Sequence, residues 1–169
     1  MTLPNFFILG AAKCGTTALY TWLAGHPGVA MSARKEPCFW SPDIARLARV
    51  TDREEYERLW DHAAEGALRG EASTAYIQSR VAVAAILAAR PDARLIAMAR
   101  NPVEMAAARH SEMLNRYQED VEDFETAWRL QTARRRGERM PPECREPQTL
   151  QYREVSAIGD QLERFMAAV

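Results

Sequence analysis

The chain has 169 residues, of which 47% are hydrophobic and 27% charged, and this composition is typical of one soluble globular domain. The formal net charge of −1 excludes the basic field of a nucleic-acid-binding protein, and the longest apolar run is too short to span a bilayer. Three cysteines without metal-like spacing argue against a disulfide framework and for a reducing compartment, so we expect a cytoplasmic protein.

The first predicted elements are a strand, a glycine loop and a helix. The apolar run at residues 6–9 is too short for an average helix and indicates a buried strand. Gly10 and Gly15 bound the loop that follows. An apolar stripe at helical spacing comes next, so the predicted helix begins at Thr16 and Thr17.

This junction has the chemistry of an anion site. A helix N-terminus carries unpaired N–H groups and a partial positive charge, and glycines let the backbone approach an anion closely. Lys13 adds a full charge, so the loop predicts a cradle for a phosphate or a sulfate. The loop is close to a P-loop, but Thr16 stands where that motif has its lysine.

Along the rest of the chain, short apolar runs alternate with helical patterns. Thr51 begins a capping box, Ser79 is a candidate helix cap, and residues 137–147 form a predicted loop. Further strands are predicted at residues 29–31, 68–71 and 95–99, and further helices at 51–62, 79–89, 102–117, 122–136 and 149–168.

This pattern predicts an α/β protein with a P-loop-like three-layer fold, in which helices flank a central parallel sheet. No repeat or linker is visible, so we expect one domain over residues 1–169. Ligands of such sheets bind beyond the carboxyl ends of the strands. We therefore expect the loop at residues 10–17 and Arg100, after the 95–99 strand, at the same edge.

The run KCGTTALYTWLAGHP, residues 13–27, resembles the 5′-phosphosulfate loop of the sulfotransferases that use 3′-phosphoadenosine 5′-phosphosulfate (PAPS). The resemblance implies PAPS as the cofactor and 3′-phosphoadenosine 5′-phosphate (PAP) as its product. It also implies a catalytic role for Lys13, which would stabilise the charge on the 5′-phosphate leaving group. The cofactor-binding residues implied in this loop are Lys13, Cys14, Gly15, Thr16 and Thr17.

The run LIAMARNPVE, residues 95–104, resembles the second cofactor motif of the same family, which implies that Arg100 binds the 3′-phosphate. The family usually has a serine six residues after the proline, and this chain has Ala108 there. Ser111, one helical turn further on, is expected to compensate in part for the missing serine, with Arg109 and His110 as nearby donors.

The segment KEPCFW, residues 35–40, resembles the Lys-Glu-Pro-His-Phe-Phe segment of carbohydrate sulfotransferases. The resemblance implies that Glu36 is the general base that takes the proton of the acceptor hydroxyl. Lys35 is expected to bind an acidic substrate or to assist Glu36. Because other sulfotransferases use a histidine, the three histidines stay as alternative bases: His26, His62 and His110.

The segment GEASTAY, residues 70–76, resembles the acceptor-side segment of the family, with Ala72 where the family often has a lysine. Two interpretations are open for Glu71, Ser73 and Tyr76. They contact the acceptor, or they form a turn with a core tyrosine.

The resemblance extends from residue 6 to residue 165 and is closest to bacterial sulfotransferase-domain proteins of the carbohydrate type. Those chains continue with a strand and a phosphate-covering loop, so we expect a C-terminally incomplete domain whose open sheet edge could pair with a second copy. The function implied is sulfuryl transfer from PAPS to a hydroxyl acceptor, such as a carbohydrate, without a metal. The alternatives are a P-loop nucleotide kinase or NTPase, which needs a lysine at position 16, and a non-catalytic nucleotide-binding relative.

Overall fold

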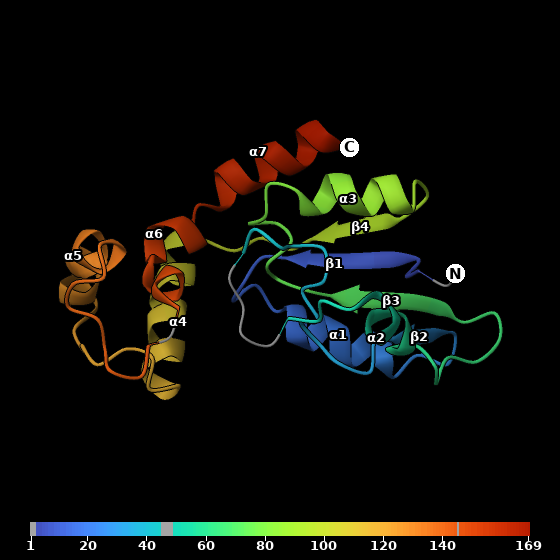
Figure 1. Cartoon of the computed structure of the whole chain (residues 1–169), viewed down its shortest axis with the longest axis horizontal. Coiled ribbons are helices and arrows are strands. Elements are labelled where there is room, and N and C mark those ends of the chain that lie inside the picture. The colour runs from blue at the N-terminus through green and yellow to red at the C-terminus, as the bar shows by residue number, and fades with distance from the viewer. Residues whose placement is uncertain (1–2, 45–48, 145) are drawn as a thin grey trace. The chain divides into compact units, whose positions relative to one another are not determined.

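The structure is a computed structural model that describes residues 3–44, 49–144 and 146–169. The chain forms two compact units, the first made of residues 1–99 and 160–169 and the second of residues 100–159. The first unit contains the sheet and the glycine loop, and the second is helical (Figure 1).

The first unit is built on a four-stranded sheet in which neighbouring strands are parallel and follow the order β2-β3-β1-β4. This confirms the predicted α/β fold with a central parallel sheet flanked by helices. The strands are β1 (Phe6–Gly10), β2 (Val29–Met31), β3 (Leu68–Ala72) and β4 (Arg94–Ala97). The helices are α1 (Thr16–Ala24), α2 (Arg53–Arg58), α3 (Ala82–Ala89) and α7 (Ile158–Ala168).

β1 is an interior strand because all of its residues are apolar or glycine, and all of them are buried. Ile8 pairs with Ala72 of β3 on one side and with Ile96 of β4 on the other. Since parallel strands run in the same direction, their carboxyl ends meet at one edge of the sheet. The glycine loop after β1 and the turn after β3 are therefore neighbours at that edge.

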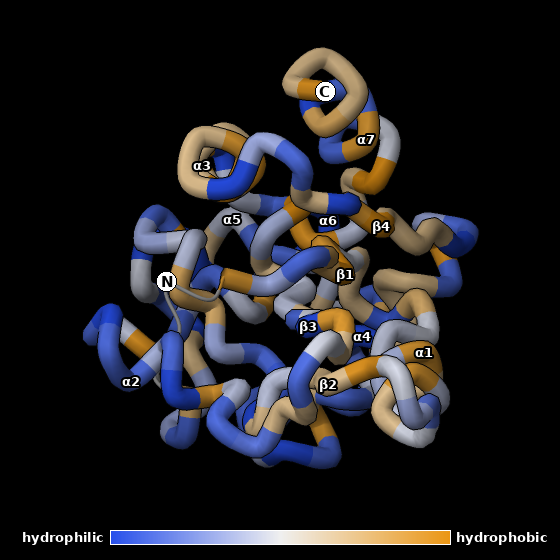
Figure 2. The backbone as a smooth tube through the Cα atoms, turned by 90° about the vertical axis from the view of Figure 1, so that its right-hand side faces the viewer, coloured by the Kyte–Doolittle hydropathy of each residue, from blue (hydrophilic) through white to orange (hydrophobic). Residues whose placement is uncertain are grey.

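Helices cover both faces of the sheet. Leu19 and Leu23 of α1 pack against the face that includes Ala72. Because side chains alternate along a strand, Glu71 points to the opposite face, where its carboxylate accepts a hydrogen bond from Tyr56 of α2. Figure 2 looks nearly along the strands and shows α1 on one side of the sheet and α2 and α3 on the other.

The second unit consists of α4 (Pro102–Asn115), α5 (Phe124–Arg135), the 3-10 helix η1 (Pro147–Leu150) and α6 (Tyr152–Val155). α4 begins as predicted, with Pro102 in its first turn and the Asn101 side chain accepting from the Val103 amide at 2.9 Å. The buried residues of its core are Ala106, Met113, Ala127, Leu150 and Tyr152.

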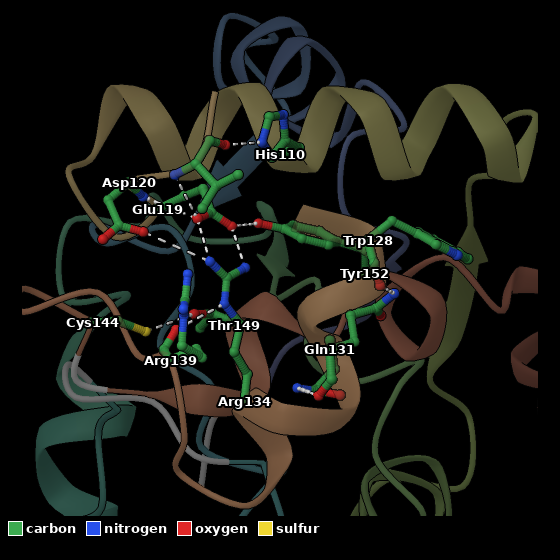
Figure 3. A network of polar contacts seen from close by, with 12 residues as sticks. His110, Glu119, Asp120, Trp128, Gln131, Arg134, Arg139, Cys144, Thr149 and Tyr152 are labelled. Atoms are coloured by element: carbon green, nitrogen blue, oxygen red, sulfur yellow. Dashed lines mark hydrogen bonds and ion pairs between the residues drawn. The ribbon is translucent and has the colours of Figure 1, made fainter. Parts of the chain in front are cut away.

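A buried ion pair connects the helices of this second unit (Figure 3). Arg134 of α5 donates to both carboxylate oxygens of Glu119 at 2.5 Å, and neither side chain is exposed. Tyr152 of α6 donates its hydroxyl to the same carboxylate at 2.5 Å. Burial raises the pKa of Glu119, but the hydrogen bonds from Arg134, Tyr152 and the Val121 amide outweigh it and hold that pKa below its usual value.

The predicted start of the capping box, Thr51, was wrong by one residue. The N-cap of α2 is Asp52, whose carboxylate accepts from the Glu55 amide at 2.8 Å, and the helix ends at Arg58 rather than near His62. An aspartate caps a helix at least as well as a threonine, and the shift keeps Glu54 and Glu55 in the first turn.

The helix predicted at residues 149–168 is divided into η1, α6 and α7. The helical pattern is interrupted at Gln151, between η1 and α6, and again at Ser156, between α6 and α7. The Ser156 hydroxyl donates to the Tyr152 carbonyl at 2.6 Å, and the Ile158 amide bonds to Ser156 O at 2.7 Å instead of continuing the helical ladder. Leu150 and Tyr152 are buried in the core of the second unit, so packing outweighs the continuous helical pattern.

The other predicted strands and helices are confirmed to within a few residues. The predicted loop at residues 137–147 includes residue 145, which lies outside the described residues. In the described ranges, no helix has both the length and the apolar composition needed to cross a membrane.

Glu119→Gln should lower the free energy of unfolding by about 3–5 kcal/mol, because it removes the buried negative charge that pairs with Arg134 and leaves that guanidinium 3.7 Å from the partly exposed Asp120 carboxylate. Urea denaturation measures this loss. Glu138→Gln is the matched control, since Glu138 and its partner Arg136 are both more than half exposed and the change should not be measurable. An equally small effect of both substitutions would contradict the central role of the buried pair.

Candidate active site

The glycine loop is held at both ends. Gly10 ends β1 with φ 131°, and Gly15 precedes α1 with φ 81°. The Ala11 amide donates to Met98 O at 2.8 Å and the Met98 amide to Gly10 O at 2.7 Å, so the chain after β4 supports the start of the loop. α1 begins at Thr16 with no side-chain cap and no acidic residue in its first turn. No carboxylate of that turn therefore competes with an anion for its first N–H groups.

The five predicted loop residues differ in exposure. Gly15 and Thr17 are exposed, Lys13 is half-buried with φ 62°, and Thr16 is buried. Cys14 is buried as well, and its thiol lies 3.5 Å from a carbonyl of the same loop. The accessible part of the loop thus combines a lysine, a glycine and a threonine at a helix N-terminus.

Thr74 connects this loop to Glu36. A Cβ atom at Gly10 would lie 3.0 Å from the Thr74 carbonyl oxygen and 3.4 Å from its Cα, so the Thr74 backbone occupies the space beside Gly10. The Thr74 amide donates to Glu36 Oε2 at 2.8 Å, and the Thr74 hydroxyl lies 3.2 Å from the same oxygen. One residue therefore separates the Glu36 carboxylate from the start of the glycine loop.

The Glu36 carboxylate is anchored but accessible. Lys35 Nζ donates to its other oxygen, Oε1, at 2.8 Å. The Glu36 amide donates to Ala72 O at 2.9 Å, which ties the segment to the end of β3. The Glu36 side chain is 33% exposed, so the anchoring does not enclose it.

A second carboxylate at this edge is fully buried. Glu71 accepts hydroxyl hydrogen bonds on Oε2 from Tyr56 at 2.5 Å and from Tyr76 at 3.0 Å, and on Oε1 from Ser73 at 2.7 Å. The pKa of Glu71 is raised to about 7, and burial is the largest cause. The charge of Glu36 also raises this pKa, whereas the three hydrogen bonds lower it without cancelling the effect of burial.

The burial of Glu71, Ser73 and Tyr76 helps to choose between the two interpretations of residues 70–76, contact with an acceptor or a turn with a core tyrosine. All three side chains are fully enclosed, with 0% exposure, and their polar groups bond to one another. This geometry favours a turn with a core tyrosine over direct contact with an acceptor.

Arg100 and Ser111 belong to the second unit. Arg100 lies just before α4, and its Nε donates to Oε2 of Glu104, in the first turn of the helix, at 2.8 Å in an exposed pair. Ser111 is exposed, and its hydroxyl donates to Ala107 O at 3.1 Å. Because that O–H serves the helix itself, Ser111 is a weak substitute for a phosphate-binding serine at Ala108.

The three histidines differ from Glu36 in their location and burial. His26 is exposed and follows the carboxyl end of α1, about 13 Å along the helix axis from its loop end. His62 is exposed after α2. His110 is buried in the second unit, where its Nε2 lies 2.8 Å from Val121 O. Glu36 is the candidate base that the structure connects to the glycine loop, through Thr74.

The chain is similar to sulfotransferases in both sequence and structure. It is 41% identical over 87 residues to human carbohydrate sulfotransferase 15, and 32% identical over 125 residues to mouse heparan sulfate glucosamine 3-O-sulfotransferase 3A1. Its structure matches the crystal structure of a sulfotransferase from Alicyclobacillus acidocaldarius with a TM-score of 0.85 and 30% identity, over 99% of this chain and 70% of that chain. The chain belongs to the sulfotransferase family.

The similarity to the first two sulfotransferases covers 47% and 73% of this chain but only 16% and 30% of those proteins. No family model matches the sequence. Family membership confirms the resemblance inferred from residues 13–27, 35–40, 70–76 and 95–104.

Two residues of this sulfotransferase-family site escaped the sequence analysis. Thr74 lies within the segment 70–76, but its contact with Gly10 depends on the pairing of β3 with β1. Tyr56 lies 15 residues before Glu71, and only its burial on α2 beside the sheet makes it a partner of that carboxylate.

Gly10→Ala should destabilise this sulfotransferase-family chain and disturb the loop. The new Cβ would lie 2.8 Å from the Ile77 side chain and 3.0 Å from Thr74 O, at a φ of 131° that only glycine adopts readily. Overpacking alone costs about 1–3 kcal/mol. Gly159→Ala is the control, since nothing lies within 4 Å of its added Cβ. Equal unfolding free energies of the two variants would rule out the close contact at Gly10.

The burial of Glu71 should make stability depend on pH. Its pKa is about 7 in the folded state against 4.5 unfolded, so the folded state binds more protons between these values. This contribution is complete below about pH 4.5 and is lost as the pH rises through about 7, by about 3 kcal/mol in total. Urea denaturation of the wild type and Glu71→Gln should show a stability difference that changes over this range. A difference independent of pH would contradict the raised pKa.

Proposed function

We propose that this chain carries the catalytic core of a PAPS-dependent sulfotransferase that acts on a hydroxyl acceptor. The observation that supports it most directly is Thr74, which lies against Gly10 of the anion-binding loop and holds the Glu36 carboxylate. A base for the acceptor and a cradle for the donor are thus joined through one residue. The names of the two relatives make a carbohydrate hydroxyl the first candidate acceptor.

The loop residues fit the donor that this proposal requires. The 5′-phosphosulfate group is anionic, and the first turn of α1 has no acidic residue to repel it. Lys13 and the exposed Thr17 supply a positive charge and a hydroxyl at the same place. Arg100, which has the fork geometry that suits a terminal phosphate, is proposed to bind the 3′-phosphate with help from Ser111.

Glu36 is proposed to take the acceptor proton. Its Oε2 already accepts the bonds of Thr74, so Oε1, shared with Lys35, is the oxygen that would receive the proton. As its proton moves to Glu36, the acceptor oxygen would bond to sulfur, and the bond between sulfur and the 5′-phosphate oxygen would break. PAPS, when bound, supplies the activated sulfuryl group. Lys13 is proposed to stabilise the negative charge that grows on the 5′-phosphate.

Lys35 is proposed to orient the acceptor as well as Glu36. The Lys35 side chain is 21% exposed and its Nζ lies 2.8 Å from Glu36 Oε1, so a hydroxyl that reaches this oxygen also meets Lys35. The proposed domain covers residues 1–169 and so includes both compact units.

Calorimetric titration with PAP and with AMP tests the donor site. PAP should bind much more tightly than AMP, and Lys13→Ala and Arg100→Ala should each weaken PAP by about 1.5–3 kcal/mol, roughly 10–150-fold, because each removes a charged hydrogen bond to a phosphate. Glu138→Gln, an exposed change, serves as the control. Equal affinity for PAP and AMP would refute the PAPS proposal, and a requirement for magnesium would favour a nucleotide kinase or NTPase.

Release of PAP from PAPS, with de-O-sulfated heparan sulfate as the acceptor, tests the base. Glu36→Gln should lower kcat about 10²–10⁴-fold, because the amide cannot accept the proton, while PAP affinity is retained. The amide keeps the size of the side chain, so the anchoring by Thr74 changes little. Unchanged turnover in Glu36→Gln would show that another group is the base.

A further inference from the structure

We propose that Glu71 is a positioning residue for Glu36: its buried carboxylate fixes the direction of the hydroxyl hydrogen bonds that hold residues 38–40, next to the base. This inference rests on the proposed function, because it assigns Glu71 a role through Glu36 rather than through contact with a substrate.

Three hydroxyl groups connect Glu71 to the segment that carries Glu36. The Cys38 amide donates to Ser73 Oγ at 3.0 Å, and Ser73 donates to Glu71 Oε1 at 2.7 Å. Trp40 Nε1 donates to the Tyr56 hydroxyl at 2.8 Å, and Tyr56 donates to Glu71 Oε2 at 2.5 Å.

The third connection runs through Tyr76. The Trp40 amide donates to the Tyr76 hydroxyl at 3.4 Å, and Tyr76 donates to Glu71 Oε2 at 3.0 Å. In all three connections, Glu71 is the final acceptor and an N–H group of Cys38 or Trp40 is the first donor.

The direction of these bonds depends on the charge state of Glu71. A hydroxyl that donates to a carboxylate keeps its lone pairs for the N–H groups of residues 38–40. A glutamine at position 71 would offer one acceptor and one donor group, so at least one hydroxyl would lose its acceptor in a buried site. A carboxylate is therefore the side chain of this size that satisfies all three hydroxyls.

The segment needs such support because its backbone is strained. Glu36 has φ 61° and Cys38 has φ 51°, on either side of Pro37, and residues other than glycine adopt this region at a cost. The Val50 amide donates to Pro37 O at 2.8 Å and supports the segment from a second direction. Glu36 directly precedes the residues that these bonds hold. Its charge raises the pKa of Glu71, as expected of neighbouring carboxylates.

A double-mutant cycle on the full chain tests the inference. Turnover is measured as PAP release from PAPS with de-O-sulfated heparan sulfate, for the wild type, Glu71→Gln, Glu36→Gln and the double variant. Glu71→Gln should lower kcat about 10-fold or more and leave the affinity for PAP within about 2-fold. In the Glu36→Gln background the same substitution should have no further effect, because Glu71 acts only through Glu36.

A matched pair of tyrosine variants serves if Glu71→Gln does not fold. Tyr56→Phe removes a hydroxyl that donates to buried Glu71 at 2.5 Å, and Tyr152→Phe removes one that donates to buried Glu119 at 2.5 Å. Both variants lose the same chemical group, but only Tyr56 is connected to the segment that carries Glu36. Tyr56→Phe should lower kcat, and Tyr152→Phe should leave kcat unchanged.

The outcomes separate this inference from the proposed function. If PAP binds and Glu36→Gln abolishes turnover, but Glu71→Gln slows both backgrounds by the same factor, the positioning role is wrong and the proposed function stands. Equal effects of Tyr56→Phe and Tyr152→Phe on kcat would overturn the positioning role as well. If PAP does not bind to the wild type, the proposed function fails, and the inference fails with it.

Discussion

The contact between Gly10 and Thr74 is the constraint on which the candidate site depends. Parallel pairing of β1 with β3 brings the ends of the two strands together, and the Ser73 amide extends that pairing by donating to Ile8 O at 3.1 Å. The turn that follows then lies against Gly10, with no room for a side chain there. As a result, the amide and hydroxyl of Thr74 meet Glu36 at the edge where the glycine loop begins.

Two buried carboxylates show how the partners of a charge decide its effect. Glu119 pairs with Arg134 and has a lowered pKa, so its ionised form stabilises the second unit. Among the described residues, the groups that donate hydrogen bonds to Glu71 are the hydroxyls of Tyr56, Ser73 and Tyr76, and the effect of burial dominates and raises its pKa. Glu71, which is costly to bury as an ion, is connected to the segment of the proposed base, Glu36. Glu119 belongs to the core of the second unit.

Elements that depend on short-range interactions could be predicted from the sequence, and those that depend on long-range packing could not. The strand at residues 29–31 and the start of α1 at Thr16 depend on local apolar patterns and glycines, and both were predicted correctly. The 149–168 helix was wrong because Leu150 and Tyr152 pack into a core that their own periodicity does not reveal. The functional segments were visible as motifs, which is why the family could be inferred before the fold was known.

The sequence by itself determined the strand–loop–helix around Lys13, the α/β class and the family, because turn chemistry, periodicity and short motifs are local properties. Only the tertiary structure decided that Thr74 holds Glu36 and that Glu71 is enclosed by hydroxyls from Tyr56 and its neighbours. Thr74 and Glu36 are 38 positions apart in the chain, and Tyr56 and Glu71 are 15 positions apart. They exist because the sheet register and the packing of α2 bring the residues together, and no local pattern encodes either of these.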